Sequence, residues 1–93
     1  MDPTVYKRGQ RLKIELQQIV RNLMGEIFNC DPHTIDSDTT MASLEAWDSL
    51  QHLNLVLAME ETLNVRFTTE EVIKMTSFDE IVTVLEYHRT STR

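Results

Sequence analysis

Apolar residues recur at spacings of three and four through the first third of the chain. This period is typical of an amphipathic helix whose apolar stripe faces a core. The pattern predicts a helix that begins between Thr4 and Gln10 and ends at Phe28. Its stripe contains Leu12, Leu16, Ile19, Leu23 and Ile27, widened by Val20, Met24 and Phe28.

The periodicity disappears from residue 29 to residue 47. Asp31-Pro32 ends the first helix and allows a single helical turn with Pro32 at its first position. A loop of about nineteen residues is long for a small domain and requires internal packing or a function. Four apolar residues in it are expected to anchor it on the core, namely Ile35, Met41, Leu44 and Trp47.

The stretch from Asp48 to Leu63 predicts the second helix, because it is rich in apolar residues and lacks Gly and Pro. Asp48 suits the N-cap position, where its carboxylate accepts a backbone N–H. Gln51 is expected to complete a capping box by reaching back to that cap. Ser49 then lies in the first turn, where unpaired N–H groups and the helix dipole favour an anionic substituent.

This helix has two apolar faces. One contains His52, Leu55, Val56, Met59 and Leu63, and the other contains Leu50, Leu53, Asn54, Leu57 and Glu61. One interpretation is a central helix packed on both sides, and the other is a docking strip beside Ser49. We expect docking for Leu50 and Leu57 and a mixed role for Leu53.

Two further helix starts follow. Thr68 with Glu71 predicts a capping box and a short helix through about Met75, and Ser77 with Glu80 predicts another. The last helix is expected from Phe78 to about His88, with an inward stripe of Phe78, Ile81, Val82 and Leu85.

Because every predicted element is a helix, the predicted fold class is all-α. We predict one domain over residues 1–93, a four-helix bundle of three main helices and a short third, with about 1–9 and 89–93 frayed.

The distribution of charge limits which classes of partner the protein can have. The net charge is −6, but residues 1–23 carry +3 and residues 31–71 carry −8. An acidic surface disfavours nucleic acid and favours a basic protein partner.

The sequence has no apolar run near the roughly 20 residues of a membrane helix, and its beginning lacks a signal-peptide core. We therefore expect a cytoplasmic monomer with no membrane span.

No metal site is predicted. The acidic stretch from Asp36 to Thr40 fails as a calcium loop, because Met41 and Trp47 stand where glycine and glutamate are needed. The three histidines are scattered singly, without the spacing of metal ligands. Cys30 is the only cysteine, so no disulfide can form within the chain.

Ser49 is the strongest candidate for a chemically functional residue. One interpretation is that Ser49 is a catalytic nucleophile. His52 is the only nearby candidate base, and the helical period places it on the core-facing side. No oxyanion hole or orienting carboxylate with recognisable spacing accompanies it. We therefore expect a protein that is not an enzyme.

Asp48-Ser49-Leu50, followed by an apolar helix that ends in Glu60-Glu61, resembles the acyl carrier protein family. The similarity runs without gaps from Asp48 to about Tyr87. It implies that 4′-phosphopantetheine, taken from coenzyme A, is attached to Ser49 beside Asp48. The thiol of this arm would carry acyl or aminoacyl intermediates as thioesters. An unmodified helical interaction module with the same fold is the alternative.

The resemblance also implies partners. These are a phosphopantetheinyl transferase and acyl-activating or acyl-transferring enzymes with basic docking patches. The residues expected to meet them are Leu50, Leu53, Asn54, Leu57, Glu60 and Glu61. An acyl-chain cleft would be lined by residues for which a plain core role is equally open, namely Val56, Met59, Phe67, Val72 and Met75.

The sequence departs from carriers of fatty-acid synthesis at two positions. Those proteins typically place carboxylates along the second helix, whereas this chain has Gln51 and Asn54. The segment LEAWDSLQHLNLVLAMEE is more similar to stand-alone carriers of specialised bacterial pathways, such as polyketide, nonribosomal-peptide or surface-glycan systems. The cargo and the pathway stay open.

Overall fold

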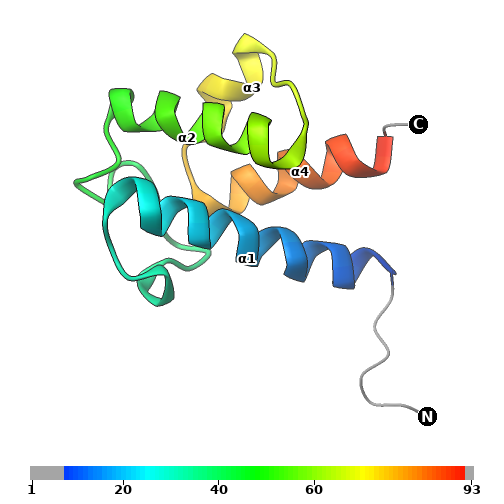
Figure 1. Ribbon diagram of the computed structural model, residues 1–93, viewed down its shortest axis with the longest axis horizontal. Coiled ribbons are helices and arrows are strands. Elements are labelled where there is room, and N and C mark those ends of the chain that lie inside the picture. Colours follow the sequence, from blue (N-terminus) through cyan, green and yellow to red (C-terminus); the bar gives the residue numbers. More distant parts are fainter. Residues whose placement is uncertain (1–7, 92–93) are drawn as a thin grey trace.

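The computed structural model describes residues 8–91 and shows a helical bundle (Figure 1). Its elements are α1 (Arg8–Phe28), the 3-10 turn η1 (Pro32–Thr34), α2 (Ser49–Leu63), α3 (Thr69–Lys74) and α4 (Phe78–Ser91). In Figure 1, α1 runs from right to left, whereas α2 and α4 run back in the opposite direction. The all-α bundle with a short third helix is confirmed. None of the helices within the described range is long and apolar enough to cross a membrane.

The helix ends lie close to their predicted positions. α1 begins at Arg8, inside the predicted range, and ends at Phe28. α4 continues to Ser91, beyond the expected end at His88. Residues 8–9 and 89–91 are helical in the structure, and the fraying that we expect there stays a prediction. Near the end of α4, His88 forms a hydrogen bond to Glu71 of α3. Residues 1–7 and 92–93 lie outside the described range.

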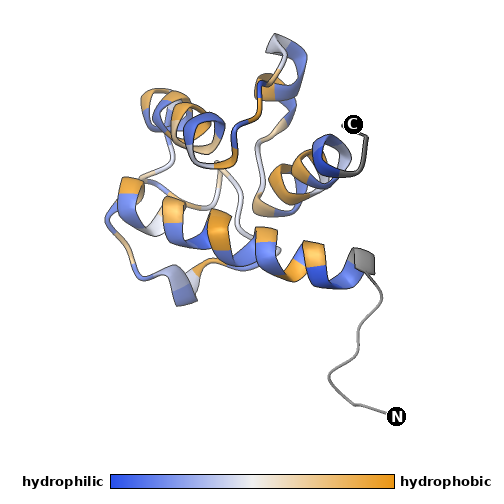
Figure 2. Ribbon diagram, turned by 45° about the vertical axis from the view of Figure 1, so that its right-hand side comes forward, coloured by the Kyte–Doolittle hydropathy of each residue, from blue (hydrophilic) through white to orange (hydrophobic). Residues whose placement is uncertain are grey.

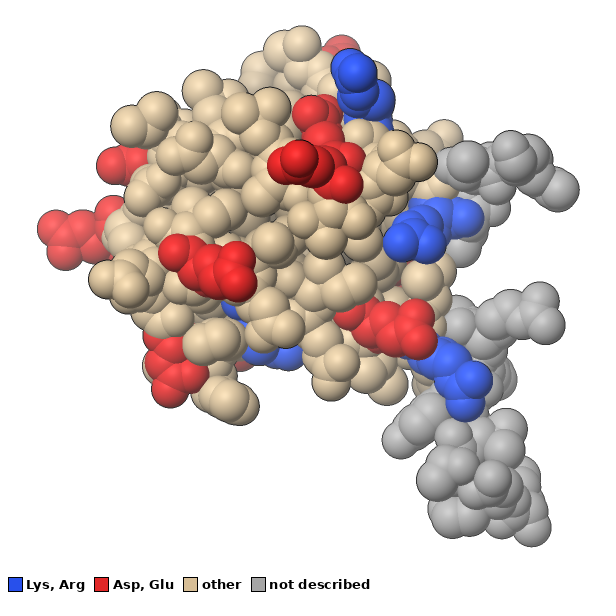
Figure 3. Space-filling model, in the orientation of Figure 1, with Lys and Arg blue, Asp and Glu red and all other residues tan. Residues whose placement is uncertain are grey.

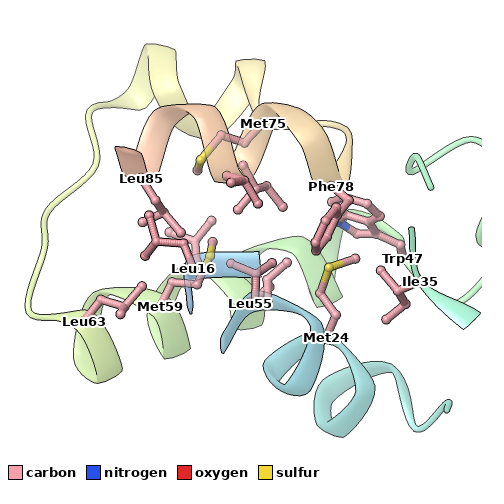
Figure 4. Packing of buried hydrophobic residues seen from close by; sticks show 14 of the residues in the cluster. Leu16, Met24, Ile35, Trp47, Leu55, Met59, Leu63, Met75, Phe78 and Leu85 are labelled. Atoms are coloured by element: carbon pink, nitrogen blue, oxygen red, sulfur yellow. The ribbon is translucent and has the colours of Figure 1, made fainter. Parts of the chain in front are cut away.

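The core is formed by side chains from three helices and from the long loop (Figure 4). Trp47 is 1% exposed, and its ring centre lies 5.6 Å from that of Phe28 on α1. Ile35 is also buried, while Met41 and Leu44 pack against the core from its edge. The prediction that these four loop residues anchor the loop is therefore confirmed. The stripe predicted for α4 is fully buried, at Phe78, Ile81, Val82 and Leu85.

Backbone hydrogen bonds attach the long loop to the start of α4. Phe78 N–H donates to the Thr39 carbonyl at 2.9 Å, and Met41 N–H donates to the Thr76 carbonyl at 2.9 Å. Thr40 and Ser77 form an isolated antiparallel bridge between these two bonds. This bridge and its two hydrogen bonds fix the middle of the long loop against the start of α4.

The loop is also held by α1. Arg21 donates from Nε to the Ile35 carbonyl at 2.8 Å, and its guanidinium lies 4.9 Å from the centre of the Phe78 ring. Gly25 allows η1 to pack closely, because a Cβ atom there would lie 2.9 Å from Cγ of Pro32. The predicted helical turn at Pro32 is confirmed.

The predicted caps of the last two helices are largely correct. Thr68 and Glu71 form the complete capping box at the start of α3. At the start of α4, Ser77 Oγ accepts from Glu80 N–H at 3.1 Å, as predicted. The Glu80 carboxylate, however, accepts from Thr76 N–H and from the Ser77 hydroxyl. The Thr76 N–H also donates to the Lys74 carbonyl at 2.8 Å, which closes a tight turn around Met75.

Glu71 also joins α3 to α4. Nε2 of His88 lies 3.0 Å from Oε1 of Glu71, and both side chains are about four-fifths buried. Burial raises the pKa of Glu71, but the hydrogen bonds from the Thr68 backbone and from His88, together with the charge of His88, outweigh it. The pKa of this carboxyl therefore lies below its ordinary value of 4.5.

The lowered pKa predicts a pH dependence of stability. A depressed folded-state pKa stabilises the protein above the unfolded-state pKa, and this contribution is lost as the pH falls through the folded value. We expect Glu71→Gln to lower the free energy of unfolding by about 0.5–1 kcal/mol near pH 7. Near pH 3 the variant and the parent should be about equally stable. Urea unfolding at both pH values measures this, and an equal deficit at both would contradict it.

Candidate functional site

The site lies where the long loop enters α2. Asp48 has an extended backbone and accepts the Gln51 N–H on Oδ1 at 2.9 Å, so it is the N-cap as predicted. His52 N–H donates to the Asp48 carbonyl at 2.8 Å and forms the first bond of the helix. Ser49 is the first helical residue, and its side chain is exposed. The hydroxyl is accessible to another protein, at the positive end of the helix dipole.

The predicted capping role of the Gln51 side chain is wrong. Its Nε2 donates to the Ile27 carbonyl at 3.2 Å, and its Oε1 accepts from Asn54 Nδ2 at 2.8 Å. Ile27 lies in the last turn of α1, where carbonyl groups have no partner within the helix. The end of α1 lies beside the start of α2, so the Gln51 amide satisfies that carbonyl. Gln51 thereby attaches the site to α1.

The two faces of α2 differ sharply in burial. His52, Leu55, Val56, Met59 and Leu63 are all buried. Leu50, Leu53 and Leu57, which we call the leucine strip, are 69%, 54% and 62% exposed. Figure 2 accordingly shows much of α2 as hydrophobic, whereas α1 alternates more evenly. The interpretation of α2 as a helix packed on both sides is wrong, and Leu53 is exposed with its neighbours.

Ile73 on α3 is a further exposed apolar residue, at 69%, which the sequence analysis missed. The helical period of this short segment could have found it. Val72 and Met75 are needed on the inner side, and Ile73 follows Val72 by about 100° around the helix.

His52 faces the core, as the helical period predicted. It is 7% exposed, and its Nδ1 accepts the indole N–H of Trp47 at 3.0 Å. Its Nε2 lies 2.8 Å from the Val72 carbonyl on α3. Both ring nitrogens are therefore engaged away from Ser49. His52 therefore cannot act as a general base for the Ser49 hydroxyl in this geometry. This argues against Ser49 as a catalytic nucleophile.

The two carboxylates at the end of α2 have different surroundings. Glu60 accepts the Phe67 N–H on Oε2 at 3.0 Å and is partly buried, because the connection to α3 turns back over it. Glu61 is exposed. Glu60 thus has a structural role, and its role in partner recognition stays a prediction. On the face shown in Figure 3, Asp and Glu are scattered, and the visible Lys and Arg lie mostly toward the right.

The residues proposed for an acyl-chain cleft belong to the interior. Val56, Met59 and Met75 are buried in the core, and Phe67 and Val72 pack against it. The core role that the sequence left open is therefore observed. A role in sheltering cargo stays a prediction.

Comparison with known proteins adds to this geometry. The model of a protein family described as a phosphopantetheine attachment site matches residues 18–85, more than half of the chain. The chain belongs to this family. It is a phosphopantetheine-carrying protein, and covalently attached 4′-phosphopantetheine is its cofactor. No curated protein sequence matches the chain significantly.

The matched range contains α2 and α3 completely, and with them the exposed serine at the head of α2. Carrier domains of this family are generally not catalysts, and they work with transferases and biosynthetic enzymes. The residues at the start of α2 fit the group. The hydroxyl is exposed, and the first-turn N–H groups favour the phosphodiester that joins the arm to the protein.

Proposed function

We propose that this carrier protein holds 4′-phosphopantetheine on Ser49 and carries acyl or aminoacyl intermediates on it for a specialised biosynthetic pathway. The observation that supports the proposal most is the position of Ser49. It is the exposed first residue of α2, directly after the N-cap Asp48, within the range that matches the family. When bound, the arm supplies a thiol that forms thioesters.

The protein's own residues present the hydroxyl. Asp48 fixes the first turn by accepting the Gln51 N–H, and Gln51 fixes that turn against α1 through the Ile27 carbonyl. A rigid helix start holds the attachment point in one geometry, which favours transfer by an external enzyme. The transferase supplies the catalysis, and this chain supplies the nucleophilic oxygen and the docking surface.

The leucine strip and Glu61 are the proposed docking surface for that transferase and for acyl-activating or acyl-transferring enzymes. The strip begins at Leu50, next to Ser49, and Leu57 extends it two turns along α2. Carriers of fatty-acid synthesis typically have carboxylates along this helix, whereas this chain has the neutral amides of Gln51 and Asn54, which form a hydrogen bond with each other. We expect a partner that depends more on apolar contact than on charge, as in specialised pathways. A cytoplasmic location and a monomeric state stay predictions.

The first experiment counts thiols. The chain has one cysteine, so the parent protein should give one thiol per molecule after denaturation. Incubation with coenzyme A and a phosphopantetheinyl transferase should raise this count to two, with one mass increment of the arm. Cys30→Ser is the matched control, and its count should rise from zero to one.

A count that stays at one in the parent, with an active transferase verified on another carrier, would contradict the proposal. The chain would then be the unmodified interaction module. A count of two with no subsequent thioester formation by any acyl-activating enzyme would leave attachment intact and refute the tested cargo classes.

Charge at the end of α2 gives a second prediction. Glu61→Lys reverses an exposed charge without removing the Glu60–Phe67 hydrogen bond. We expect the modification rate to fall several-fold at low salt and to approach that of the parent at about 0.5 M salt, because salt screens exposed charges. Glu26→Lys, which reverses the charge of an exposed residue on α1, is the control. Equal rates for the Glu61 variant and the parent at low salt would show that Glu61 does not steer the partner.

A further inference from the structure

Trp47, His52 and Val72 form a chain of two hydrogen bonds that runs from the residues flanking Ser49 in the sequence to α3. The indole Nε1 of Trp47 lies 3.0 Å from Nδ1 of His52, and Nε2 of His52 lies 2.8 Å from the Val72 carbonyl. We call this the Trp47–His52–Val72 bridge. It connects the end of the long loop, the first turn of α2 and α3.

The partners determine the protonation of the imidazole. An indole N–H can only donate, so Nδ1 must accept and carries no proton. A carbonyl can only accept, so Nε2 must carry the proton. His52 is therefore the neutral Nε2–H tautomer, in a position that is 7% exposed. An aliphatic or a charged side chain at this position would break at least one of the two bonds.

The bridge closes a short stretch of chain around the attachment residue. Trp47 and His52 stand two residues before and three residues after Ser49, and their side chains bond to each other. The backbone N–H of His52 also donates to the carbonyl of Asp48, the residue before Ser49, at 2.8 Å. Trp47 also packs against Phe28 of α1, whose ring centre lies 5.6 Å from that of Trp47. The backbone on both sides of Ser49 is thus fixed from the interior.

The other end of the bridge fixes α3. Val72 lies in the last turn of a six-residue helix, where carbonyl groups have no partner within the helix. The Thr76 N–H, which would reach Val72 in a longer helix, instead donates to the Lys74 carbonyl at 2.8 Å. His52 satisfies the Val72 carbonyl and holds α3 at a fixed distance from the start of α2.

We propose that His52 is a positioning residue for phosphopantetheine transfer to Ser49, acting through Trp47 on the backbone of the attachment turn and through Val72 on α3. This inference rests on the proposed function. His52 does not touch the reacting atoms, since both of its nitrogens are engaged on the core side. Its role is to hold the Ser49 hydroxyl in the one geometry that the transferase accepts, while the leucine strip provides binding.

Three variants separate the two bonds. His52→Leu removes both. An asparagine amide oxygen occupies roughly the place of Nδ1, so His52→Asn retains an acceptor for Trp47. A glutamine amide nitrogen reaches about as far as Nε2, so His52→Gln retains a donor for Val72. Val82→Ala, a buried truncation on α4, is the control for lost stability alone.

The experiment measures kcat and KM of the carrier for modification by the transferase, per folded molecule. We expect His52→Leu to lower kcat about tenfold or more with KM within about twofold, because positioning acts on the reacting geometry. His52→Asn and His52→Gln should recover part of that loss. The indole N–H resonance of Trp47, the only tryptophan, should move in His52→Leu and stay near its parent position in His52→Asn.

Two results would overturn the proposal. One is a kcat for the His52 variants equal to that of Val82→Ala, and the other is a loss that appears only in KM. If His52→Leu does not fold, the Asn and Gln variants decide the question by the same criteria. Failure of the parent to accept the arm at Ser49 would refute the proposed function instead, and the indole resonance would still report the bridge.

Discussion

Ser49→Ala is expected to abolish attachment of phosphopantetheine and to leave the fold intact. The Ser49 side chain is exposed and contributes no cap, because the capping carboxylate belongs to Asp48. Alanine also has the highest helix propensity, so the free energy of unfolding should change by less than about 0.5 kcal/mol. Intact-mass measurement after incubation with transferase and coenzyme A should show the unmodified mass only.

Two controls define the result for Ser49→Ala. Circular dichroism and urea unfolding establish that the variant is folded, so the loss of modification is chemical. Ser43→Ala, in the exposed part of the long loop, should be modified at about the parent rate. Modification of Ser49→Ala to the same extent as the parent would move the attachment to another hydroxyl and refute the assignment.

The second large effect concerns the leucine strip. Leu50→Ala and Leu57→Ala are each expected to slow modification about tenfold, because exposed apolar anchors that a partner buries typically contribute more than 1 kcal/mol to binding. Stability should fall by less than about 1 kcal/mol, since both side chains are already more than 60% exposed. We expect a similar but smaller effect for Leu53, which is 54% exposed.

Leu55→Ala provides the matched comparison, because it is the same substitution on the same helix at a fully buried position. It should cost about 2–5 kcal/mol of stability and leave the modification rate per folded molecule near that of the parent. The measurements are urea unfolding and initial rates for all four variants. Large stability losses at Leu50 and Leu57 with unchanged rates would contradict the docking role.

The helices could be predicted because their signals are local. The apolar period of α1, the Asp48 cap and the Thr68–Glu71 capping box each depend on residues within a few positions of one another. For the leucine strip, the pattern along the chain permits two interpretations, burial or exposure. A helical period identifies two apolar faces but does not determine which of them another helix covers.

Side-chain partners distant in sequence could not be predicted. Gln51 bonds to Ile27, twenty-four residues away, although its spacing from Asp48 favoured a capping box. The bond from His52 to Val72 joins residues twenty positions apart. Such contacts depend on how the helices pack, and a pattern along the chain contains little information on packing. The role of Ser49 could be predicted because it depends on a short motif at a helix start.

Localisation of the arm within the parent protein tests the central claim most directly. Trypsin cleaves after lysine and arginine, and residues 22–66 form one peptide that contains Ser37, Ser43 and Ser49. After treatment with transferase and coenzyme A, fragmentation of this peptide by mass spectrometry should place the added mass on Ser49 alone. An arm on Ser37, on Ser43 or on any other peptide would contradict the account.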